Sequence, residues 1–115
     1  MTPNALPTVE HTKVHTLLHQ LGVLPKYKGF YHTSFACCLC MQQPERLQLV
    51  TKQIYPEVAK HFDTNWHCVE RNIRTVSSLA WHKNRTLLED MARCELLKRP
   101  TASAFLAILT TQLWV

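Results

Sequence analysis

Residues 55–81 read YPEVAKHFDTNWHCVERNIRTVSSLAW, and this stretch decides the fold. Its second part repeats apolar residues at intervals of four, three and four positions, which are Val69, Ile73, Val76 and Ala80. Because this spacing places them on one side of an α-helix, we predict a helix over about residues 65–81 with one buried seam. Most other residues of this helix are polar, which predicts an outer face open to solvent or to a ligand.

A shorter helix precedes the long one, with Val58, Ala59 and Phe62 as its predicted inward residues. It ends at residues 63–65, Asp-Thr-Asn, which are all turn or N-cap formers. A short helix, a tight turn and a longer helix with a polar outer face are typical of a helix-turn-helix, here at about residues 55–81. The turn contains no glycine, which departs from the common form of the motif.

Helical spacing also precedes the motif. We predict a helix over residues 9–21, which Gly22 should end, and a second helix over residues 26–43. A third segment begins at Pro44, and Pro56 divides it from the short helix or kinks it there. Its predicted inner residues are Leu47, Val50 and Ile54.

The C-terminal part is predicted to be helical only in places. Residues 82–99 are expected to be basic and irregular, with a short helix near residues 86–91. Pro100-Thr101 opens a last helix. Because no segment alternates apolar and polar residues as a strand does, we predict an all-α, single compact domain of about five to seven helices.

The composition agrees with one small domain. The chain has 115 residues, of which 46% are hydrophobic and 18% charged, and this excludes a disordered chain. It has two glycines and no GxGxxG or GK[ST] motif, which counts against nucleotide-binding enzymes. Residues 1–8 carry two of the six prolines and no periodicity, so we expect a flexible tail there and the helical domain over residues 9–115. The net charge of +5 fits a nucleic-acid partner without requiring one.

The chain shows no sign of export. Its first residues form no signal peptide, and no stretch approaches the roughly 20 apolar residues of a membrane span. We therefore expect a cytoplasmic protein with no membrane partner, whose five cysteines are thiols.

Three of these cysteines, Cys37, Cys38 and Cys40, suggest a metal site that His32 or His67 would complete. Zinc sites usually pair cysteines as CxxC on a turn, whereas these lie in an apolar run that predicts a helix. Neighbouring residues on a helix point about 100° apart and do not converge on one ion. We therefore predict buried thiols, no metal and no other cofactor.

The outer face of the long helix suits the major groove of DNA, where the first two turns of a helix reach base edges and flanking cations contact phosphates. Arg71 and Arg74 form an i,i+3 pair suited to phosphates or to guanine, and Glu70 can accept from a cytosine amine. Thr64 and Asn65 are expected to offer backbone and side-chain donors to a phosphate.

Other interpretations of this face remain open. Glu70 and Arg74 are also spaced as an ion pair on a solvated surface, which is worth only about 0.3–0.5 kcal/mol. Trp66 either packs under the domain or lies against sugars and methyl groups. The seven histidines permit a pH response through His67 on this face, although the abundance of histidine explains its presence as well.

A set of short sequence motifs, which follow one another in order along the chain, is more specific than a helix-turn-helix pattern alone. They are residues 19–23, 27–30, 49–60, Val69-Glu70-Arg71, Ile73-Arg74, Ala80-Trp81 and, more weakly, residues 98–105. In these elements the chain resembles the C-terminal DNA-binding effector domains of the response regulator that initiates sporulation in endospore-forming bacteria, the stage 0 sporulation protein A family.

The resemblance implies an all-helical DNA-binding transcription regulator whose helix over about residues 65–81 enters the major groove. It also implies that two copies bind adjacent sites in tandem and that the domain touches an RNA polymerase sigma factor. Glu70, Arg71 and Arg74 match family positions that contact a base or phosphates. No acidic phosphoacceptor pocket precedes residue 19, so we expect an effector domain without a receiver domain, either stand-alone or excised from a longer chain. The start at Met1 favours the stand-alone form.

Two departures from the family pattern lie on the DNA face. Cys68 stands where the family carries an arginine that reads a guanine, and Thr75 stands where it carries a histidine near the backbone. An arginine–guanine contact contributes roughly 1–3 kcal/mol of discrimination, so we expect an altered or relaxed target. The segment over residues 82–99 is also shorter than in the family, which counts against activation through a sigma factor.

Two other classes of function are compatible with a small helical domain of this composition. A protein-interaction module that kept the fold and lost specific DNA recognition would use Trp66 and Cys68 as a contact surface, and would modulate a related regulator or a sigma factor. An enzyme would need a nucleophile and a base in a recognisable arrangement, and no Cys–His pair has one. We therefore predict that the chain has no catalytic residues.

Overall fold

The computed structural model describes residues 9–114, and side chains from residue 11 onward. The predicted tail over residues 1–8, and the last residue, lie outside the described part. The elements are α1 (Val9–Gln20), α2 (Lys28–Gln42), a 3-10 helix (Pro44–Gln48), a π-helical turn (Val50–Ile54), α3 (Tyr55–His61), α4 (Trp66–Ala92) and α5 (Ala102–Leu113). Since residues 9–114 contain no strand, the all-α prediction is confirmed.

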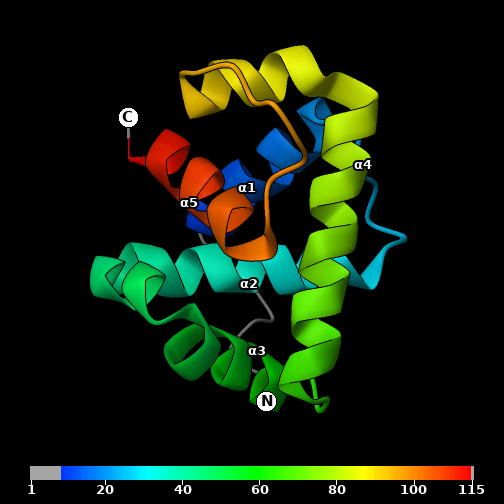
Figure 1. The fold of residues 1–115 in the computed structure, drawn as a ribbon. Helices are drawn as coiled ribbons and strands as arrows, with labels where there is room; N and C mark the ends of the chain where they lie inside the picture. The colour runs from blue at the N-terminus through cyan, green and yellow to red at the C-terminus, as the bar shows by residue number, and fades with distance from the viewer. Residues whose placement is uncertain (1–8, 115) are drawn as a thin grey trace.

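The first part of the long helix α4 stands along one side of the molecule, where α2 crosses it, and after a kink at Asn84 the second part turns across the top of the view (Figure 1). Gly29 lies at this crossing. A Cβ atom there would collide with the backbone oxygen of Asn72 and with a methyl group of Val76. The two helices therefore meet backbone to backbone, and this contact sets the position of α4 relative to the rest of the domain.

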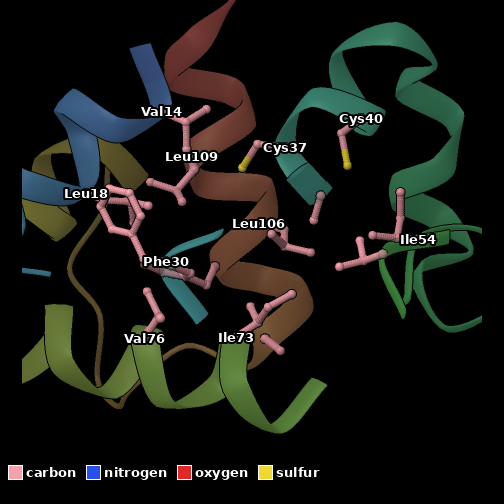
Figure 2. Packing of buried hydrophobic residues seen from close by; sticks show 14 of the residues in the cluster. Val14, Leu18, Phe30, Cys37, Cys40, Ile54, Ile73, Val76, Leu106 and Leu109 are labelled. Carbon is pink, nitrogen blue, oxygen red and sulfur yellow. The ribbon is translucent and has the colours of Figure 1, made fainter. Parts of the chain in front are cut away.

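The apolar core is centred on α5, whose Leu106 and Leu109 are fully buried. Figure 2 shows these two side chains among residues of α1, α2 and α4. Phe30 of α2 is among the largest buried side chains, and Ile73 and Val76 reach the core from α4. The buried side of α4 thus packs against the core around α5.

Gly22 ends α1 as predicted. Its φ of 88° lies in the left-handed region, where glycine has no Cβ penalty. The Val23 N–H donates to the Leu18 carbonyl at 2.9 Å and the Gly22 N–H to the His19 carbonyl at 2.9 Å, which together form a Schellman motif.

The segment over residues 44–54 differs from the regular helix that was predicted. Val50 and Ile54 are buried, but Leu47 is half-buried, and the chain forms a 3-10 helix followed by a π-helical turn. Pro56 has no N–H for an i→i−4 bond, and the N–H of Tyr55 reaches back to the Val50 carbonyl instead. Pro56 therefore marks the start of α3 rather than a kink within a longer helix.

Residues 82–92 belong to α4, whose two parts meet at a kink at Asn84. The second part contains the short helix predicted near residues 86–91, but the irregular chain predicted before it, after residue 81, was wrong. Asn84 alone has non-helical angles, with φ of −153° and ψ of 63°. Its side chain accepts from the Leu87 N–H at 3.2 Å and donates to the Gln20 carbonyl at 3.0 Å. Asn84 therefore acts as an N-cap inside the helix, and the predicted short helix near residues 86–91 is the segment that it starts.

Candidate nucleic-acid interface

The rotation of α4 is fixed by the predicted seam. Val69, Ile73, Val76 and Ala80 all have 0% exposure. On the opposite side of the helix, four side chains are exposed to solvent: His67, Arg71, Arg74 and Thr75. We call these four residues the outer face of α4. Its cations are thus held on a rigid helix whose other side is anchored in the core.

The turn before α4 is built without glycine. Asp63 adopts φ of 55°, the left-handed conformation that a glycine commonly supplies in such turns and that Asp and Asn tolerate. Asn65 then caps α4, because its side chain accepts from the Cys68 N–H at 2.9 Å. Thr64 and Asn65 are both exposed at this end of the helix, where the helix dipole favours an anion. No acidic residue lies in the first turn of α4.

The two arginines of the outer face make weak internal contacts. Arg74 lies 3.4 Å from a carboxylate oxygen of Glu70, and the two side chains are 48% and 39% exposed. Arg71 donates to the sulfur of Cys68 at 3.6 Å. The predicted Glu70–Arg74 pair therefore exists, but an exposed pair of this kind contributes about 0.3–0.5 kcal/mol and can be exchanged for a ligand at little cost.

Trp66 does not pack under the domain. It is 38% exposed, and its ring stacks on His67 with centroids 3.8 Å apart. Thr75 also remains exposed, with its hydroxyl donating to the Arg71 carbonyl at 3.0 Å. All nine residues that the sequence singled out therefore lie on the turn or along the outer and lateral sides of α4.

A hollow that the sequence did not predict lies beside the outer face. It measures about 520 Å³ and is bounded by the start of α2, the α3–α4 turn and one side of α4. Lys28 and Tyr31 enter it from α2, and Cys68, Arg71 and Asn72 from α4. No local signal could have linked Lys28 with Arg71, because only the α2–α4 crossing brings them to the same place.

The cysteines of α2 are buried thiols. Burial raises the pKa of Cys40 to about 11, and burial likewise raises the pKa of Cys37 well above its usual value. Deprotonated sulfur is the form that binds metals, so these positions disfavour a metal. Within residues 9–114, no group of three His, Cys, Asp or Glu side chains is arranged to hold a metal ion.

The second half of α4 uses its cations differently. Arg85 lies over the ring of Trp81 at 4.1 Å and donates to a carboxylate oxygen of Glu89 and to the Leu96 carbonyl. Arg99 donates to the Ser78 hydroxyl at 2.6 Å. These contacts attach the segment after α4 to the helix itself.

The sequence model of the family described as "Sporulation initiation factor Spo0A C terminal" matches residues 14–113. The chain belongs to this family. The Spo0A C-terminal family consists of DNA-binding effector domains of a sporulation regulator and is not a family of enzymes. The resemblance inferred from the linked sequence elements is therefore confirmed, and DNA is the partner class that the family indicates.

Across residues 9–114, no helix is both long enough and apolar enough to cross a bilayer.

Proposed function

We propose that this Spo0A C-terminal domain binds duplex DNA in a sequence-specific manner, with the first half of α4 in the major groove. The observation that carries this proposal is the exposure of Arg71 and Arg74 on a helix whose opposite side is fully buried. Arg71 and Arg74 would contact phosphates or a guanine, and Glu70 a cytosine amine. Thr64 and Asn65 would hold a phosphate at the positive end of the helix.

The remaining outer residues would contact the groove walls. Trp66 and His67, stacked on one another, present an aromatic surface to sugars and base methyl groups. Thr75, one turn further along, would lie near a phosphate of the backbone.

The binding experiment has two steps. Sequences bound by the domain are selected from a random duplex pool, and the Kd for the selected duplex is then measured over a series of salt concentrations. We expect the affinity to fall steeply with salt, and Arg74→Ala to weaken binding to selected and unrelated duplexes by a similar factor. Lys13→Ala is the matched control, because Lys13 is an exposed cation on α1. A domain that binds no duplex in a salt-sensitive manner at micromolar concentration would contradict the proposal.

We also propose that Cys68 alters the target relative to other members of the family. Its side chain is partly exposed at the edge of the outer face. By resemblance, an arginine at this position reads a guanine, and Cys68→Arg should restore that preference by about 1–3 kcal/mol at one base pair. A second selection with this variant tests the idea, and an unchanged motif would count against it.

A protein-interaction module is the second candidate function. It is favoured by the exposed stack of Trp66 on His67 and by Leu97, which is 87% exposed. Such a module would form a complex with a related regulator or with a sigma factor, and the complex would persist at high salt. The first candidate predicts instead that the dominant partner is DNA, on which two copies bind in tandem.

A further inference from the structure

The hollow beside α4 carries two cations from different helices. Lys28 and Arg71 are both exposed, and they line it from α2 and α4 respectively. Within the described residues, no carboxylate lies within ion-pair distance of either side chain. His32, which also lines the hollow, adds no charge near neutral pH, since burial lowers its pKa and the charge of Lys28 lowers it further.

The hollow lies where a DNA strand would pass if α4 entered the major groove. An α-helix with its side chains is about 10–12 Å across, and the groove is about 12 Å wide. A helix in the groove therefore turns its two flanks toward the two sugar–phosphate strands. Cys68 and Asn72 form one flank of α4, next to the start of α2.

We propose that this hollow binds one backbone phosphate of the duplex that α4 contacts. Lys28 and Arg71 supply the positive charge, and Tyr31, which is 44% exposed, supplies a hydroxyl donor. The inference rests on the proposed DNA-binding function and extends the interface from α4 to α2. Lys28 is thus a backbone contact that fixes the orientation of the domain without reading sequence.

Asp63 opposes this role and provides the sharpest test of it. Asp63 belongs to the α3–α4 turn and is among the residues that line the same hollow. Asp63→Asn removes the charge while keeping a residue that tolerates the left-handed φ of 55°. If a phosphate occupies the hollow, this variant must bind DNA more tightly than the parent chain.

The experiment compares the parent chain with Lys28→Ala, Asp63→Asn and the control Lys13→Ala, using the selected duplex and an unrelated duplex. We expect Lys28→Ala to weaken both complexes by a similar factor and to reduce the slope of log K against log salt by about 0.9, the value for one phosphate. Asp63→Asn should strengthen both complexes, and Lys13→Ala should leave both unchanged. Lys28→Gln keeps most of the side-chain stem and serves as a second variant if alanine lowers the melting temperature.

The outcomes separate this inference from the function on which it rests. If Arg71→Ala weakens binding but Lys28→Ala and Lys28→Gln behave like Lys13→Ala, the hollow holds no phosphate and the DNA-binding proposal stands. If Asp63→Asn weakens binding, the inference is likewise overturned. If the parent chain binds no duplex, both proposals fail.

Discussion

The two halves of α4 differ in how strongly their arginines interact with other groups of the domain. In the first half, Arg71 and Arg74 are exposed and contact a side chain of their own helix at 3.6 and 3.4 Å. In the second half, Arg85 lies 4.1 Å from the ring of Trp81 and also donates to the Leu96 carbonyl. The first pair is available to a ligand, whereas Arg85 connects α4 to the segment that follows it.

This contrast shows why a basic composition does not by itself locate a DNA-binding surface. Arg85 and Arg99 belong to residues 82–99, which the sequence predicts to be basic, but both are hydrogen-bonded within the fold. Arginines that already donate hydrogen bonds to other groups of the domain contribute to its stability. Arginines with weak partners on a rigid face are the ones that can exchange those partners for phosphates.

The largest expected effect is a loss of stability when the contact between α2 and the first half of α4 is disturbed. Gly29→Ala would force a methyl group against the backbone of Asn72, which cannot move aside, so we expect a loss of about 3 kcal/mol in the free energy of unfolding. Gly22→Ala meets the side chain of Lys83 at 2.9 Å, which can move, and should cost about 1–2 kcal/mol through its positive φ. Urea denaturation measures both. Equal losses would show that the α2–α4 crossing is not the tighter contact.

The second effect should separate stability from binding. Arg85→Ala removes the stacking on Trp81 and the bond to the Leu96 carbonyl, and we expect a loss of about 1–2 kcal/mol in stability. DNA affinity should stay close to that of the parent chain. Lys98→Ala, an exposed cation in the same segment, is the control and should change stability by less than about 0.5 kcal/mol. A large loss of DNA affinity in Arg85→Ala would show that the second half of α4 also contacts DNA, which contradicts the difference drawn between the two halves.

The smallest effect is a dependence of stability on pH. Burial, and the charges of His11 and His19, lower the pKa of His15, and burial lowers the pKa of His32. The unfolded chain therefore binds more protons near pH 6.5 than the folded chain does, so the free energy of unfolding should rise with pH through this range. The melting temperature should accordingly fall as the pH is lowered from 7.5 to about 5.5. His15→Gln should flatten this slope. A melting temperature that rises on acidification would contradict the assignment.

The helices were predictable wherever a single periodicity governs them. The seam over Val69 to Ala80 needs only one buried side, and every predicted member of it is buried. The same holds for α1, whose end at Gly22 depends on local backbone chemistry. Segments with competing local signals, such as residues 44–54 before Pro56, were predicted less well.

Long-range contacts account for what the sequence could not reveal. The continuation of α4 depends on Asn84, whose side chain reaches the Gln20 carbonyl of a helix far away in the sequence. The hollow depends on the α2–α4 crossing at Gly29, which places Lys28 beside Arg71. The outer face and the Glu70–Arg74 pair were predictable, but the contact of Arg71 with Cys68 and the flank supplied by α2 were not.

An NMR titration of the domain with its selected duplex, read as amide shifts along the chain, tests whether the first half of α4 and the start of α2 contact DNA. We expect the largest shifts on residues 64–75 and on the start of α2 near Lys28, with little change from Arg85 to Arg99. Shifts that cluster on the segment after α4, and spare Arg71 and Arg74, would contradict it.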